Sequence, residues 1–227
     1  MAATQGIFTR DTFRFFSDLK KNNKKAWMDA NRDRYRESIV QPLKKLLEEM
    51  GPAVLDLDHR FETTGRRGAN FSRINRDIRF AKDKTPYRPQ MYLKFSAPLD
   101  GEMESGELYV GISADSVTAG FRIYAMPKRK QSPIALLAEP RLARNPRWLA
   151  HQKAKIGKKY ESYWYSTVKG EWTKKSGWPT NEDWQKLQGW IIRKKLSPTA
   201  ATRGSFPNDI AKIFRDVFPV LKMVSLA

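Results

Sequence analysis

The spacing of hydrophobic residues changes twice along this chain, and this change restricts the fold more than any other feature. Near the start, Phe13, Phe16 and Leu19 share one helical face behind Thr9, a residue type that caps helices. Near the end, Ile210 to Phe218 again has helical spacing. In between, apolar residues alternate with polar ones in four segments, around residues 74–80, 91–95, 108–112 and 117–123. The pattern predicts an α+β fold, with a mainly antiparallel sheet packed by N-terminal and C-terminal helices.

No linker or composition break divides the chain, so we expect a single α+β domain over residues 1–227. Within it, residues 1–127 form the core and 128–195 a basic, tryptophan-rich segment that includes a short helical piece from Trp184 to Lys195. Residues 205–227 are expected to form a helix that packs on the core.

Composition excludes several classes of protein. The chain has 227 residues, no cysteine and a formal net charge of +19. No apolar run approaches the roughly 20 residues that span a bilayer, and Met1–Arg10 does not resemble a secretory signal. We therefore expect a cytoplasmic protein with a basic surface and no membrane partner. Without thiols, a Walker loop or clustered carboxylates, we expect neither a metal nor a cofactor.

The excess positive charge is concentrated in residues 128–195, which hold 17 Lys+Arg and 5 Asp+Glu. The same segment contains six of the seven tryptophans: Trp148, Trp164, Trp172, Trp178, Trp184 and Trp190. Cations interleaved with flat rings suit a nucleic acid, because cations neutralise phosphates and rings stack on bases. Equally, the rings can fill a core beneath solvated lysines. A nucleic-acid interface on this basic face and an ordinary packed core both remain open.

The densest polar stretch runs from Arg73 to Arg88. As a strand it would place Arg73, Asn75, Asp77 and Arg79 on one face, and Ile74, Arg76, Ile78 and Phe80 on the other. Asp77 would then bond to Arg79, and Arg76 on the apolar face would require a carboxylate or a ligand. Thr85-Pro86 constrains the following turn, from which Lys82, Lys84 and Tyr87 project.

Three functions fit this stretch. In the first, Arg73, Arg76 and Arg79 bind a phosphorylated or carboxylated ligand in a pocket, and Asp77 orients them. Lys82, Lys84 or Tyr87 would supply protons if the protein is an enzyme, which the sequence leaves undecided. In the second, the nucleic-acid interface of 128–195 carries the function. In the third, the stretch is an ion-pair lattice that only stabilises the fold.

Two runs also resemble a known family. Asn22-Asn23, Trp27, Asn31-Arg32 and Tyr35, followed by the run Arg76–Tyr87, are similar to the signature of a bacterial and fungal family, domain of unknown function 2461. The resemblance covers roughly residues 8–123 and returns in the last helix. It brings no established activity, but it implies which positions matter: Trp27, Asn31, Arg32, Tyr35, Arg76, Asp77, Arg79, Lys82, Asp83, Lys84 and Tyr87.

Overall fold

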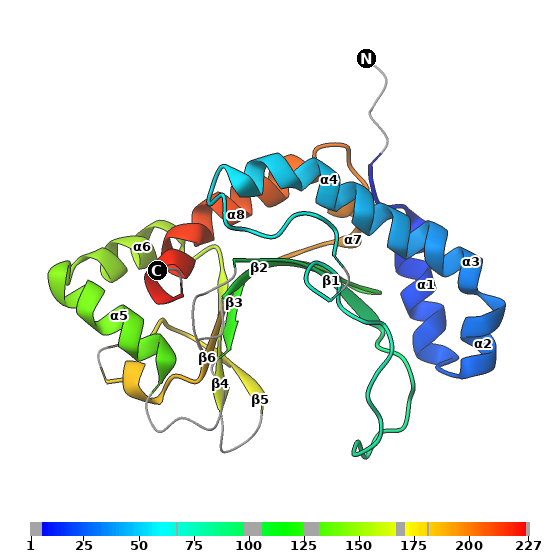
Figure 1. The fold of residues 1–227 in the computed structure, drawn as a ribbon, viewed down its shortest axis with the longest axis horizontal. Coiled ribbons are helices and arrows are strands. Elements are labelled where there is room, and N and C mark those ends of the chain that lie inside the picture. The colour runs from blue at the N-terminus through cyan, green and yellow to red at the C-terminus, as the bar shows by residue number, and fades with distance from the viewer. Residues whose placement is uncertain are drawn as a thin grey trace. The chain divides into compact units, whose positions relative to one another are not determined.

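A computed structural model describes residues 6–66, 68–97, 106–124, 132–166, 171–180 and 182–225. Its helices and its six-stranded, mainly antiparallel sheet confirm the α+β class (Figure 1). The chain forms two compact units. Unit 1 comprises Met1–Phe95, Val110–Thr118 and Leu196–Ala211, and unit 2 comprises Ser96–Tyr109, Ala119–Lys195 and Lys212–Ala227. The expectation of one domain stays a prediction.

The helices and strands follow one another in the order that the change in spacing predicts, with additional strands late in the chain. The helices are α1 (Arg10–Lys21), α2 (Lys25–Ala30), α3 (Arg32–Tyr35), α4 (Gln41–Leu55), α5 (Pro133–Arg144), α6 (Trp148–Ile156), α7 (Pro198–Ala201) and α8 (Phe206–Val224). A π-helix, Arg36–Val40, precedes α4, and a 3-10 helix, Trp184–Lys186, precedes β6. The strands are β1 (Gln90–Ser96), β2 (Glu107–Ser113), β3 (Val117–Tyr124), β4 (Glu161–Ser166), β5 (Glu171–Lys175) and β6 (Gly189–Leu196).

The sheet has the strand order β1-β2-β3-β6-β4-β5. Strand β4 is antiparallel to both neighbours, with Tyr165 opposite Trp172 of β5 and Trp164 opposite Trp190 of β6. In unit 2 the end of α8 packs beside the start of β2, where the Gly106 N–H donates to Ser225 Oγ. No helix in the described ranges combines the length and the apolar character needed to cross a membrane.

The core of unit 1 is built on the face of α1 that the sequence predicts. Phe13, Phe16 and Leu19 are buried there. A proline lies near the start of helix α4: a π-helix ends directly before α4, in which Pro42 occupies the first turn. Proline lacks the N–H that the Ser38 carbonyl would accept in a regular helix. The buried Thr12 hydroxyl donates to that carbonyl instead, at 2.8 Å.

The first predicted strand, around residues 74–80, is wrong. Residues 71–89 form a long loop with two isolated bridges, Phe71 to Leu93 and Asn75 to Tyr87, before β1 begins. Two carboxylates explain the difference, because they bond to nearby backbone N–H groups and compete with a strand ladder. Asp77 accepts from the Arg79 N–H at 3.2 Å, and Asp83 accepts from the Thr85 N–H at 2.9 Å.

In unit 2 the expected helical piece from Trp184 to Lys195 is also wrong, because only Trp184–Lys186 is helical and Gly189–Leu196 is strand β6. The three residues Trp190, Ile191 and Ile192 are all buried. A short continuous apolar run of this kind is compatible with a buried strand as well as with a helix. Pairing with β4 selects the strand.

Candidate functional site

Residues 71–89 are called the motif loop here. The residue directly before this loop has a buried side chain that the sequence analysis missed. Asn70 is fully buried, and its Nδ2 donates to the carbonyls of Glu62 at 2.7 Å and Lys94 at 2.9 Å. Its Oδ1 accepts from the Gly65 N–H at 3.0 Å. The sequence does contain one sign of this role: Asn70 lies two residues after Gly68, and asparagine side chains in turns often bond to the backbone.

The base of the motif loop is closed by backbone bonds and by one distant asparagine. The Arg76 N–H donates to the Pro86 carbonyl and the Arg88 N–H to the Ile74 carbonyl, both at 2.8 Å. Asn23, between α1 and α2, donates to the Tyr87 carbonyl at 2.8 Å and accepts from the Tyr87 N–H at 3.0 Å. This two-bond clamp joins the two parts of the sequence that resemble the family signature.

Within the motif loop, two arginines are held by two carboxylates, and the sequence analysis predicts one of these pairs, Asp77 with Arg79. Arg79 donates to Asp77 through Nε at 3.0 Å and Nη2 at 2.7 Å. Arg76 donates to the Asp83 carboxylate and to the Thr85 hydroxyl, so of the two partners that the sequence analysis left open, a carboxylate or a ligand, the carboxylate is present. These contacts orient both guanidinium groups.

The same contacts keep the two carboxylates ionised. The Arg79 side chain and N–H lower the pKa of Asp77. The Thr85 N–H, the Arg76 guanidinium and the Thr85 hydroxyl lower the pKa of Asp83 to about 2. Both groups are therefore negatively charged at neutral pH and are unsuited to donate protons there.

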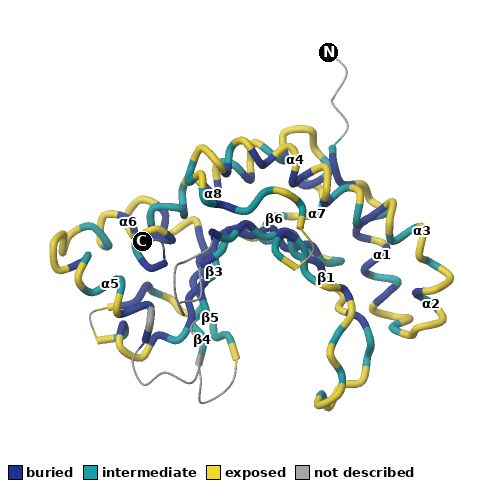
Figure 2. Tube along the Cα trace, in the orientation of Figure 1, coloured by how far each residue is buried: buried dark blue, intermediate teal, exposed yellow. Residues whose placement is uncertain are grey.

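Three other cations of the motif loop are exposed and have no side-chain partner among the described residues: Arg73, Lys82 and Arg88. Lys84 Nζ donates to the carbonyls of Ile78 at 3.1 Å and Arg79 at 3.4 Å. With six Lys or Arg and two Asp, the loop has a formal charge of +4. It extends away from β1 (Figure 1), and its tip is exposed (Figure 2).

Phe80 departs from the alternation that the sequence implies for the motif loop, whereas Ile74 follows it. Ile74 is buried, with 6% of its surface exposed, but Phe80 is 95% exposed rather than on an apolar face. Tyr87 is only 4% exposed. Of the three groups considered as proton donors, only Lys82 and Lys84 are therefore at the surface.

Helices α2 and α3 hold the other candidate residues in structural contacts. Trp27 of α2 and Tyr35 of α3 both pack on Phe15, with ring centroids 5.5 and 5.8 Å away. Asn31 Nδ2 donates to the Trp27 carbonyl at 2.8 Å and ends α2. Arg32 is exposed and pairs with Asp29 at 3.2 Å.

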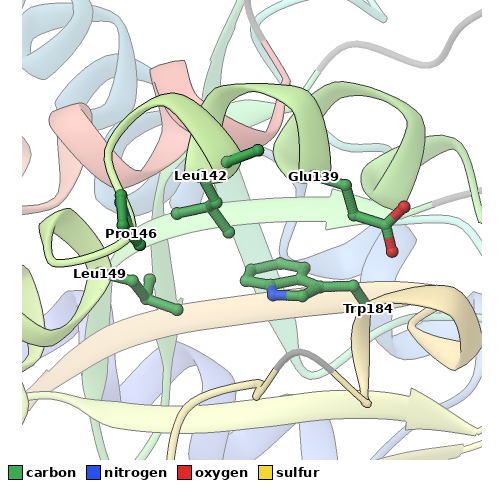
Figure 3. A pocket seen from close by; sticks show the side chains of 6 residues that line it. Glu139, Leu142, Pro146, Leu149 and Trp184 are labelled. Carbon is green, nitrogen blue, oxygen red and sulfur yellow. The ribbon is translucent and has the colours of Figure 1, made fainter.

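Unit 2 contains a pocket that the sequence analysis did not predict (Figure 3). Its volume is about 320 Å³, and it is lined by Glu139, Leu142, Ala143, Pro146, Leu149 and Trp184. The walls are mostly apolar, and the Glu139 carboxylate, which accepts from Gln185 Nε2 at 2.6 Å, adds negative charge. An anion would be repelled here, so this pocket does not provide the anion site that the motif predicts.

The tryptophans of residues 128–195 divide into two groups. Trp178, Trp184 and Trp190 are buried, whereas Trp148, Trp164 and Trp172 are half-buried. The Trp190 ring lies 5.5 Å from Trp178 and 5.7 Å from Trp184, both edge-to-face. These three rings form a core cluster and are unavailable for stacking on a base.

Asp58 is engaged in a local ion pair that gives a pH-dependent stability. Bonds from the Arg60 side chain lower the pKa of Asp58 to about 2, from an ordinary value of 3.8. A lowered folded-state pKa contributes stability that is present above pH 3.8 and lost as the pH falls towards 2.

Asp58→Asn should therefore lower the free energy of unfolding by about 1 kcal/mol at pH 6. Urea titrations at pH 6 and pH 2.5 should show this difference shrinking at low pH; a difference that persists at pH 2.5 would contradict the assignment.

Comparison with known proteins supports the resemblance seen in the sequence. No curated protein matches the chain. The family described as conserved hypothetical protein (DUF2461) matches residues 11–223, which include the motif loop, the Asn23 clamp and α8 up to its penultimate residue. Since this match covers nearly the whole chain, the protein belongs to the DUF2461 family of conserved hypothetical proteins.

Proposed function

We propose that the protein binds a phosphate-bearing anion through the motif loop. The observation that carries this proposal is that Arg73, Lys82 and Arg88 are exposed and lack side-chain partners in the described part of the chain. In the same loop, Arg76 and Arg79 already have Asp83 and Asp77 as partners. If the loop were only an ion-pair lattice that stabilises the fold, we would expect these three cations to have carboxylate partners as well.

The exposure of the loop favours an anion with several charges. A single contact between exposed charges contributes only about 0.5 kcal/mol, because water and salt screen it. Several phosphates on one chain bind more tightly, because each phosphate contact releases counterions. The proposal is one of binding, and in it the ionised carboxylates of the loop orient Arg76 and Arg79, while the buried Tyr87 makes no contact with the anion.

Removing the free cations tests the proposal. We expect the triple variant Arg73→Ala, Lys82→Ala, Arg88→Ala to bind labelled inorganic polyphosphate at least about tenfold more weakly at low salt. The slope of log affinity against log salt should fall by about 2, which is the value for three lost contacts on a flexible chain. Fluorescence anisotropy over a salt series measures both quantities.

The matched control removes three exposed cations elsewhere in unit 1: Arg10→Ala, Lys20→Ala, Lys44→Ala. Its formal charge loss is the same, so it reports the effect of net charge alone. Equal weakening by both triples would contradict a specific role for the motif loop.

A second candidate function is nucleic-acid binding by residues 128–195. It is favoured by half-buried rings beside cations: Arg193 lies 4.2 Å from the Tyr163 ring centroid, and Lys175 lies 5.1 Å from that of Trp164. The exposed lysines Lys153, Lys155 and Lys158 belong to the same segment. Their triple alanine variant, titrated with labelled oligonucleotide, should lose affinity if this face binds and should match the parent if the motif loop binds.

A further inference from the structure

One side chain of the motif loop is not explained by charge. Phe80 is 95% exposed, whereas the other exposed large apolar residues in the described part of the chain, Leu55 and Leu136, are 40% and 44% exposed. Almost the whole Phe80 side chain is therefore accessible to solvent. Ile74, six residues earlier, is buried, so the loop does have access to an apolar interior.

The tip that carries Phe80 is ordered by its own hydrogen bonds. Arg79 is fixed by its fork to Asp77, and its guanidinium carbon lies 5.9 Å from the centre of the Phe80 ring. Lys84 also bonds to the carbonyls of Ile78 and Arg79. The ring is thus presented on a turn that these bonds brace, with the Arg79 guanidinium beside it.

We propose that the anion bound by the motif loop is a single-stranded nucleic acid, and that one of its bases stacks on Phe80. This inference rests on the proposed function, because the loop's cations must first bind the phosphates. Single-stranded nucleic acids alternate phosphates with flat rings, and proteins bind them with cationic surfaces that carry aromatic side chains. The sequence from Arg79 to Lys82 places an aromatic ring between cations in this way.

Other anions fit the loop less well. Inorganic polyphosphate has no ring to cover Phe80. In a duplex the bases are already stacked, and inserting a side chain between them has an energetic cost. If Phe80 inserted into a lipid surface, the charged side chains of Arg79, Lys82, Asp77 and Asp83 would approach that surface with it. A single ring among four charged groups is a poor membrane anchor.

The test compares Phe80 variants on probes with and without bases. We expect Phe80→Ala to weaken binding of a labelled oligothymidylate about tenfold, because loss of one stacked base has roughly this effect. The variant should leave binding of an abasic oligomer of the same length, and of inorganic polyphosphate, unchanged. Phe80→Tyr should retain affinity for the oligothymidylate, and Phe80→Leu should behave like the alanine variant. Because Phe80 is exposed, we expect all three variants to fold like the parent, and circular dichroism checks this.

The outcomes separate the two proposals. If Phe80→Ala binds oligothymidylate as the parent does, or loses affinity equally for the abasic oligomer, stacking is refuted while phosphate binding stands. If the triple variant of Arg73, Lys82 and Arg88 binds polyphosphate like its matched control, the proposed function itself fails. Loss of binding to phosphatidylserine vesicles in Phe80→Ala, with oligothymidylate affinity intact, would overturn the inference in favour of a lipid surface.

Discussion

Trp190→Ala should lower the free energy of unfolding by about 4 kcal/mol. The Trp190 side chain is fully buried, and its ring lies 5.6 Å from Phe121, 5.5 Å from Trp178 and 5.7 Å from Trp184. Removing it leaves a cavity among these rings, and the Ser162 hydroxyl loses the indole N–H that it accepts at 3.1 Å. Urea denaturation followed by circular dichroism measures the change.

Trp172→Ala is the matched control, because Trp172 lies on β5 and is half-buried against Tyr124 and Tyr165. We expect a cost of about 1–2 kcal/mol there, in proportion to the smaller buried area. Similar costs for the two variants would contradict the view that the Trp190 cluster forms the core of unit 2.

Asn70→Ala should lower the free energy of unfolding by about 3 kcal/mol. The variant removes three hydrogen bonds at once and leaves the Gly65 N–H and the Glu62 and Lys94 carbonyls without this partner. Buried backbone groups that lose their partners in a protein interior are costly, because no water replaces the bond. Thermal and urea denaturation of the variant measure the loss.

Asn22→Ala provides the comparison for Asn70. Asn22 is exposed, and its side chain makes one bond, to the Asp18 carbonyl at 3.0 Å. Its loss should cost less than about 1 kcal/mol. If Asn70→Ala were equally mild, the start of the motif loop would be held by its backbone contacts alone, such as the 2.7 Å bond from the Lys94 N–H to the Asn70 carbonyl.

The spacing of hydrophobic residues predicted a helix or strand correctly where one face of that helix or strand is buried and the opposite face is exposed. The face of α1 and the alternating burial of β1 follow this rule. Strands β2 and β3 alternate in sequence, but each contains a continuous buried run, residues 108–112 in β2 and residues 119–121 in β3. The spacing failed for β4, β5 and β6, which the sequence analysis did not predict as strands. Strand β6 begins with a continuous buried run, and β5 has no buried residue, so neither shows clean alternation.

The candidate site was predictable where its contacts are local. Asp77 and Arg79 are two residues apart, so their spacing was enough to expect this pair. Asp83, the carboxylate that Arg76 binds, is seven residues away and was not identified as its partner from the sequence. The clamp between Asn23 and Tyr87 joins residues 64 positions apart. No periodicity within either segment indicates that contact.

By itself, the sequence determined the α+β class, the positive charge and the pairing of Asp77 with Arg79, because each depends on composition, on spacing or on neighbours along the chain. Only the tertiary structure decided which rings are buried. Trp190 is enclosed while Phe80, which alternation would place with Ile74, is exposed to water. Burial requires a second surface brought from elsewhere in the chain, and the pattern of one segment does not specify whether such a surface is present.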